Sequence, residues 1–427
     1  MTRVQQIAGA FVATIFVTSL ALAGGFQLNE VGARAMGMGG AFAAQSNDLS
    51  AMYFNPAGLA TQMGFRASVG ATMIMPSSSY TTTAGASTDM VSQTFFPPNV
   101  YASYGLQNGL VFGVGFFAPF GLGTEWPAGW VGRYYAMKAD IQDFVLNPTV
   151  AYKVNDKLLV GAGFSYMFSN VKLSYNIRTF SALPPIPANI SPTDGSVTLD
   201  ADGNSWGFDV GAIYKPLPAM SVGASYRHST EVTYEGTATF TSMQAVKDYF
   251  PGGTGQTAIK FPNQVFTGIS YQFTPSLLVE FDFQWIGWST YDTLSIILPS
   301  GPNFPYTPGK PLQASSKSPK SWYNATMLRL GGEYQYQAWA FRLGFIYDTT
   351  PQPSQYVEPI LPDANRMEGT IGLGYKFSDN LSVDAAYQLI LFNDRTVTGP
   401  TTGDMNKFPG TYKSSANLFA LSVSYFR

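Results

Sequence analysis

The chain of 427 residues contains no cysteine and one histidine, His228. Without cysteine there is no disulfide framework and no thiolate chemistry. Metal sites built from His and Cys are excluded as well, so we expect no metal centre, unless one is built from oxygen ligands alone. His228 precedes Ser229, but a Ser-His hydrolase needs a base held by an orienting group, and no local motif supplies one. The sequence therefore predicts no catalytic residues, no cofactor and no enzyme activity.

Charge is also scarce. Charged residues make up 12% of the chain, about half of the usual share in soluble domains. The net charge of −2 offers no basic stripe for nucleic acid. Yet the mean hydropathy is only +0.02, and after residue 23 no stretch reaches the length of a membrane-spanning helix. Such a chain must conceal its apolar side chains by alternation, as strands between lipid and a polar interior do.

The first 23 residues have the pattern of a targeting segment. Arg3 provides a positive start, residues 7–22 are apolar, and Ala21-Leu22-Ala23 fits a small-x-small cleavage site. We therefore expect a signal peptide over residues 1–23, cleaved after Ala23, and export of the mature chain.

From residue 64 onward the dominant period is two. Val279, Phe281 and Phe283 alternate with Glu280 and Asp282, which places the two sets on opposite faces of a strand. The same split recurs at residues 65–72, 341–348 and 382–389. A charge on the lipid face is costly, so we expect the charged set in the lumen: Glu280, Asp282, Arg329, Glu333, Arg342 and Asp384.

Short turns and longer loops also alternate along the chain. Six short polar turns are expected at residues 106–109, 155–157, 215–219, 273–276, 335–338 and 378–380. Seven longer loops, rich in Pro, Gly, Ser and Thr, are expected at residues 76–93, 119–132, 177–204, 236–256, 293–321, 350–365 and 396–412. This rhythm predicts an all-β fold: a fourteen-stranded antiparallel transmembrane β-barrel over residues 64–427, with short periplasmic turns and long external loops.

Residues 24–63 do not alternate. Ala, Met and Gly dominate, and a helical recurrence of apolar residues is interrupted by Gly37, Gly39 and Gly40. The segment is too apolar to be solvated, and a barrel of this size encloses more room than its own side chains fill. We therefore expect an N-terminal plug, or hatch, inside the lumen.

Two motifs carry a family resemblance. Gly25-Phe26-Gln27-Leu28-Asn29-Glu30 after the cleavage site and Asn55-Pro56-Ala57-Gly58 before the first strand resemble the FadL/TodX-type transporters of the outer membrane. Looser similarity continues through residues 120–126, 130–134, 328–334, 341–351 and 361–366. The family includes long-chain fatty acid transporters and relatives that admit aromatic hydrocarbons.

The resemblance implies a fourteen-stranded barrel closed by a hatch, to which Phe26, Asn55, Pro56 and Ala57 belong. It also implies an external groove, an apolar pocket above the hatch and a kinked third strand that opens the wall sideways. That strand is expected near residues 109–118, running into Pro119.

Five residues are candidates for ligand binding, each with an alternative. Arg133, Arg329 and Arg366 could each meet a carboxylate headgroup, or could form the ion pairs that a barrel lumen needs anyway. Trp126 and Trp130 could line an apolar access groove, or belong to the aromatic girdle at the membrane surface.

The leading hypothesis is passive uptake of a hydrophobic compound, long-chain fatty acid foremost. The alternatives are an aromatic or alkane hydrocarbon channel and, in another class, an adhesin or a general porin. We expect a monomer in the bacterial outer membrane, in contact with lipid and lipopolysaccharide and inserted by the barrel assembly machinery. The terminal Arg427 stands where such chains usually end on an aromatic residue.

Overall fold

The computed structural model describes residues 24–180, 192–241, 250–299, 316–398 and 408–427; the expected signal peptide lies outside them. The helical elements are α2 (Ala33–Gly37), α3 (Ala51–Phe54), η1 (Pro56–Thr61), η3 (Trp288–Thr290) and η4 (Ser354–Tyr356). The strands are β1 (Gly64–Thr82), β2 (Ser87–Asp89), β3 (Pro98–Gly105), β4 (Leu110–Phe117), β5 (Gly121–Glu125), β6 (Lys138–Lys153), β7 (Leu158–Phe180), β8 (Pro192–Leu217), β9 (Met220–Arg227), β10 (Thr230–Thr241), β11 (Gly253–Phe261), β12 (Gln264–Thr274), β13 (Leu277–Ile286), β14 (Thr293–Ile297), β15 (Ser316–Pro319), β16 (Ala325–Tyr336), β17 (Trp339–Asp348), β18 (Arg366–Ser378), β19 (Leu381–Phe392), β20 (Arg395–Val397) and β21 (Gly410–Phe426). Among the described residues, no helix is long and apolar enough to cross a membrane.

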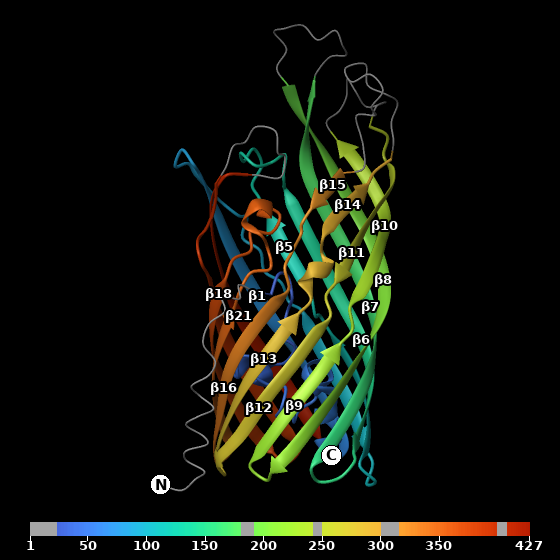
Figure 1. Cartoon of the computed structure of the whole chain (residues 1–427), viewed down its shortest axis with the longest axis vertical. Coiled ribbons are helices and arrows are strands. Elements are labelled where there is room, and N and C mark those ends of the chain that lie inside the picture. The colour runs from blue at the N-terminus through green and yellow to red at the C-terminus, as the bar shows by residue number, and fades with distance from the viewer. Residues whose placement is uncertain (1–23, 181–191, 242–249, 300–315, 399–407) are drawn as a thin grey trace.

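These strands form a closed barrel. In the described residues, 21 strand segments pair antiparallel, and seven wall crossings consist of two segments each: β2/β3, β4/β5, β9/β10, β11/β12, β13/β14, β15/β16 and β19/β20. The wall therefore has 14 crossings, as predicted. It closes where β1 pairs with β21 from Arg66↔Phe426 to Thr82↔Gly410. Figure 1 shows the short turns at the end where the C-terminus lies.

The two faces of the wall carry the side chains that alternation predicts. Phe281 and Phe283 on β13 are 49% and 39% exposed and face the lipid, whereas Glu280 and Asp282 between them are buried inside. The other expected lumen charges are buried as well: Arg329, Glu333, Arg342 and Asp384. A polar interior behind an apolar outer face is the arrangement that a lipid environment requires.

Several of the expected loops are shorter in the structure, because the strands extend into them. β7 and β8 pair as far as Phe180↔Pro192, so most of the expected loop at residues 177–204 is strand. Likewise, β10 continues to Thr241 and β11 begins at Gly253 within the expected loop at 236–256. Above the lipid both faces of a hairpin can be polar, so alternation stops while the backbone ladder continues. Figure 1 shows the hairpin of β7 and β8 rising above its neighbours.

The third crossing is interrupted where the kink was expected. β4 pairs with β6 up to Phe117↔Val145, and β5 resumes the pairing at Gly121↔Gln142. Three residues, 118–120, thus stand opposite two on β6, and Pro119 among them has no N–H to donate. An extra residue of this kind bends the strand and ends local pairing.

The N-terminal segment packs inside this wall. α2 contacts β17, β18 and β19, and η1 contacts β6, β7 and β8. Ala35, Met38, Phe42, Met52 and Phe54 are fully buried. In Figure 1 this segment appears as dark blue ribbon within the lower half of the barrel. These contacts support the predicted plug.

Candidate functional site

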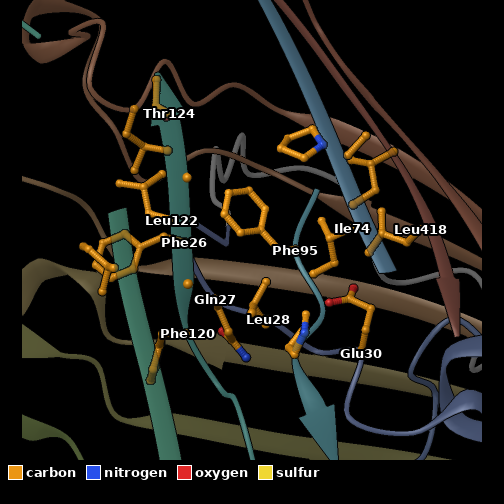
Figure 2. Close-up of a pocket in the computed structure, with 18 of the residues that line it drawn as sticks. Phe26, Gln27, Leu28, Glu30, Ile74, Phe95, Phe120, Leu122, Thr124 and Leu418 are labelled. Carbon is orange, nitrogen blue, oxygen red and sulfur yellow. The ribbon is translucent and has the colours of Figure 1, made fainter. Parts of the chain in front are cut away.

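An apolar cavity of about 420 Å³ lies between the N-terminal segment and the upper wall. Its lining is mostly apolar and comes from the start of the chain, from β1, from the region of the break and from β19 and β21. The principal lining residues are Phe26, Leu28, Ile74, Phe95, Phe120, Leu122, Ile141, Leu361, Ile390, Ala416 and Leu418 (Figure 2). Ligand pockets for small molecules are mostly apolar cavities of roughly 300–1,000 Å³, so this one has a suitable size and chemistry.

The start of the chain forms one side of the cavity. Phe26 packs against five aromatic rings with centroid distances from 4.7 to 6.2 Å: Phe120, Phe261, Trp288, Tyr291 and Trp322. Gly25 before it has φ of 57°, and a Cβ there would lie 2.7 Å from the Trp322 ring, so only glycine fits. The aromatic packing and the glycine together fix Phe26 at one side of the cavity.

This segment also pairs with the break in the third crossing. Gln27 and Phe120 form an isolated antiparallel bridge, flanked by hydrogen bonds from Leu28 N–H to the Pro119 carbonyl (2.9 Å) and from Gly121 N–H to the Phe26 carbonyl (3.0 Å). The residues that leave the wall ladder therefore find backbone partners on the plug instead.

The cavity reaches the wall beside this break. Phe95, Phe96 and Pro97 line it from the second crossing, and residues 121–124 line it from the third. Ladder pairing between β3 and β4 ends at Val100↔Phe116, below these residues. The Phe95 ring occupies the space that a side chain at Gly123 would need, since a Cβ there would lie 2.0 Å from the ring. Phe96 next to it is 63% exposed.

The polar end of the cavity contains Arg366 and several carboxylates. Arg366 lies 2.6 Å from Asp348, 3.0 Å from Glu368 and 3.9 Å from Asp363. Glu30 of the plug also lines the cavity and is labelled in Figure 2. Burial raises the pKa of Glu30, and the nearby Glu368 raises it further, which favours the uncharged carboxyl.

Two wall carboxylates hold the middle of the plug. Asp282 accepts hydrogen bonds from the backbone N–H groups of Phe42 (2.7 Å) and Ala43 (2.8 Å). Glu280 accepts those of Ala44 (2.6 Å) and Gln45 (3.0 Å). Four consecutive backbone donors are thus satisfied by one strand, which ties this part of the plug firmly to β13.

Asn55 joins the plug to a nearby part of the wall, at β8. Its Nδ2 donates to the carbonyls of Ala43 (2.8 Å) and Ala212 (3.2 Å), and its Oδ1 accepts from the Ala57 N–H (3.2 Å). The last bond caps η1, with Pro56 at its first position, where the missing N–H costs nothing. The structure therefore places Asn55, Pro56 and Ala57 together at a buried junction; their role as a hatch stays a prediction.

Replacing Asn55 with Ala should loosen this junction. The change leaves buried carbonyls without donors, at a cost of about 1–3 kcal/mol. We expect faster tryptic cleavage after Arg34 within the plug, measured on the purified folded barrel. Asn155→Ala is the matched control, because Asn155 caps the N–H groups of Lys157 and Leu158 in an exposed turn. Equal cleavage rates in both variants would contradict the proposed role.

The two tryptophan candidates lie outside the cavity lining. Trp126 and Trp130 stack at 4.3 Å and are buried in an external aromatic cluster with Tyr80, Phe408 and Tyr412. Their N–H groups donate to the carbonyls of Pro359 (3.0 Å) and Ala136 (2.8 Å). A role in ligand access stays a prediction for both.

The arginine candidates fall into three environments. Arg133 pairs with Asp194 at 2.6 Å in the external region. Arg329 is fully buried, 5.9 Å from the Phe266 ring, and its three nitrogen atoms have no hydrogen-bond partner in the part of the chain that the structure describes. Of the three, Arg366 lines the cavity. His228 stacks on the lipid-facing Phe208 at 4.8 Å, away from the lumen.

The sequence reasoning did not identify the polar residues of the cavity lining other than Arg366 as site residues; Gln27, Asp143 and Asp363 are among them. For Asp143 a signal was present. It stands between Ile141 and Val145 on the inward-facing set of its strand, where an acid among apolar neighbours is unusual. The proximity of Asp363 and Gln27 to the cavity follows from tertiary packing, since neither lies in a strand.

Comparison with known proteins agrees with this architecture. The profile of the family described as outer membrane protein transport protein (OMPP1/FadL/TodX) matches residues 14–426. The long-chain fatty acid transport protein of Escherichia coli O6:H1 is 24% identical, with 87% of this chain and 88% of that protein covered. The outer membrane protein P1 of Haemophilus influenzae is 24% identical, with 77% of this chain and 75% of that protein covered.

Solved structures share the fold. The crystal structure of a Pseudomonas aeruginosa FadL homologue superposes with a TM-score of 0.81 at 21% identity, covering 94% of this chain and 100% of that one. That of the Ralstonia pickettii toluene transporter TbuX gives 0.68 at 20% identity, with 94% and 100% covered. The chain therefore belongs to the outer membrane protein transport family (OMPP1/FadL/TodX) and is an outer-membrane channel for hydrophobic compounds, not an enzyme.

Proposed function

We propose that this channel takes up long-chain fatty acids passively, through an external groove, the apolar cavity and a sideways exit at the break in the third crossing. The observation that carries the proposal is that one cavity touches both the N-terminal segment and the interrupted wall. Family membership favours transport over the adhesin and general porin alternatives. A relative is named a long-chain fatty acid transport protein, which supports this substrate.

The proposal requires the cavity to change shape. Burying one methylene group stabilises a complex by about 0.8 kcal/mol, so a chain of about 16 carbons gains on the order of 10 kcal/mol in a dry cavity. A ligand held that strongly leaves slowly. The segment containing Phe26 lines the cavity and is paired with the break, and its displacement would lower the affinity and free the exit together. Phe95 is the second side chain that must move, because it fills the space beside Gly123.

A second candidate is uptake of an aromatic or other neutral hydrocarbon. Arg366 is ion-paired with three carboxylates, which leaves little positive charge for a fatty acid carboxylate. Another similar structure is named a toluene transporter. The two candidates differ in whether the ligand has a polar end that the cavity recognises.

Filling the cavity should stop uptake of either substrate. Ala416 lines the cavity from β21, so Ala416→Trp places an indole inside it. In cells that lack the wild-type gene, we expect uptake of labelled oleate to return with the wild-type chain. It should stay at least about tenfold lower with the variant, because the indole takes the space of the ligand and each 1.4 kcal/mol of lost binding lowers affinity about tenfold. Phe419→Trp is the control, because Phe419 lies on the same strand and faces the lipid.

The uptake assay also separates the two candidates. Labelled toluene is measured beside labelled oleate in the same cells. Transport of oleate alone supports the fatty acid channel, and transport of toluene alone supports the hydrocarbon channel. If cells with and without the gene take up both compounds equally, the proposed function is overturned.

A further inference from the structure

Acidic side chains outnumber basic ones in the lining of the cavity. Of the described residues that line it, four are carboxylates and one is a cation: Glu30, Asp143, Asp363, Glu368 and Arg366. The cation is already engaged, because Arg366 lies within 4 Å of Glu368, Asp363 and Asp348. A ligand that carries a negative charge would therefore find no free cation in the described lining, and burying an unpaired charge is costly.

The unpaired polar atoms of the lining are acceptors. Gln27 Oε1, Asp143 Oδ2 and Asp363 Oδ1 belong to side chains that are at least nine-tenths buried, and none has a hydrogen-bond donor among the described residues. The Gln27 amide is oriented by its other end, since Nε2 donates to Tyr53 (2.8 Å) and to Asn29 (2.8 Å). A buried acceptor without a donor costs free energy until a donor reaches it.

Asp143 stands where the cavity meets the wall. On β6 it lies opposite residues 118–120, which leave the ladder, and the neighbouring residues 142 and 144 line the cavity with it. One carboxylate oxygen accepts a hydrogen bond from the Ser169 hydroxyl, and the other has no partner. Within the described chain Asp143 makes no ion pair, so its Oδ2 can accept a hydrogen bond from a ligand at the exit side of the cavity.

We propose that the cavity selects hydrophobic compounds whose polar end donates a hydrogen bond, and that Asp143 is a specificity-determining acceptor for that end. Suitable ligands are long-chain alcohols, phenols and un-ionised carboxylic acids, so a fatty acid would occupy the cavity in its un-ionised form. A carboxylate anion is disfavoured because Arg366 is already paired, and an ester has no donor. This inference rests on the proposed function, because it assumes that the cavity is the ligand site.

The test is a competition among ligands of equal chain length. Purified folded barrel is incubated with equimolar hexadecanol, methyl hexadecanoate and hexadecanoate at neutral pH, and bound adducts are counted by native mass spectrometry. We expect the alcohol adduct to exceed the ester adduct by about tenfold, since an unmatched buried acceptor costs about 1–3 kcal/mol. The carboxylate adduct should be the weakest of the three.

Asp143→Asn tests the assignment to this residue. The amide supplies a donor as well as an acceptor, so the preference for alcohol over ester should shrink to within about twofold and binding of hexadecanoate should rise. Asp379→Asn is the matched control, with the same charge change at an exposed turn. Asp379 is absent from the cavity lining and pairs with Lys376.

The outcomes are distinguishable. Equal binding of alcohol and ester by the wild-type barrel overturns the inference while leaving the proposed function standing. Absence of every adduct, together with gene-independent uptake, overturns the proposed function itself. An unchanged preference in Asp143→Asn removes the role of Asp143. If that variant does not fold, the wild-type competition still decides whether the cavity requires a donor.

Discussion

Uptake should fall to near background when Gln27→Cys and Phe120→Cys are joined by a disulfide. These residues form the isolated bridge between the start of the chain and the break in the third crossing. The flanking hydrogen bonds at residues 28 and 121 make the pair a non-hydrogen-bonded one, with Cα atoms about 4.5 Å apart, which suits a disulfide. The bond would hold the N-terminal segment across the proposed exit.

The measurement is uptake of labelled oleate by cells expressing the double variant, before and after mild reduction. We expect at least about a tenfold loss of uptake when the pair is oxidised and recovery when it is reduced. A disulfide that raises the free energy of the open state by about 1.4 kcal/mol already lowers the population of that state about tenfold. The chain has no native cysteine, so a single disulfide can form.

Three controls accompany this experiment. Each single cysteine variant measures the effect of losing the native side chain. Ser68→Cys with Ser424→Cys places a disulfide across the closing seam, where the two hydroxyl oxygens are 3.0 Å apart. The seam disulfide should leave uptake intact, because it only reinforces the pairing of β1 and β21 that already closes the barrel. Full uptake in the oxidised Gln27/Phe120 variant would mean that ligand leaves without movement of this segment.

Replacing Arg342 with Met should destabilise the barrel by about 3–5 kcal/mol, the usual cost of removing one member of a buried ion pair. Arg342 bonds Glu333 at 2.6 Å and Asp384 at 2.7 Å, and all three side chains are buried. Arg34 of the plug also pairs with Glu333 at 2.9 Å, so this network connects the wall to α2. Its loss leaves an uncompensated buried carboxylate.

The change in stability is measured by urea unfolding in detergent, followed by tryptophan fluorescence. Lys413→Met is the control, since Lys413 and Asp394 form an exposed pair whose removal should cost about 0–1 kcal/mol. Adding Asp384→Asn to the Arg342 variant should restore part of the loss, because it removes one orphaned charge. A loss no larger than the control's would show that the network contributes nothing to the folded state.

Both predictions concern how the plug is held. The middle of the plug is bonded to wall residues Glu280 and Asp282 through four backbone N–H groups. The start of the chain, around Phe26, is held by aromatic packing and by the two backbone bonds at the break. Charge-assisted bonds are roughly twice as strong as neutral ones. We therefore expect the segment near Phe26 to move at lower cost than the middle of the plug.

The sequence by itself determined the barrel, its strand number and the residues that face the lumen. Apolar and polar side chains must alternate along a strand in lipid, and each charge on its outer face is costly. The faces of Phe281 and Asp282 can therefore be assigned from the local sequence alone. The six short turns were located correctly for the same reason, since alternation stops where the chain leaves the membrane.

Only the tertiary structure decided where the loops begin and what the cavity contains. Beyond the lipid, the amino-acid composition of β7 and β8 no longer indicates that the two strands are paired. Their extension is therefore seen only in the backbone pairing of the two strands. Charges such as Arg366 were predicted for the lumen, but their partners come from distant positions: residue 348 on β17 and residue 363 outside any strand. Whether a buried cation is free or neutralised depends on which strands the closed barrel brings together, and local pattern carries no information about that.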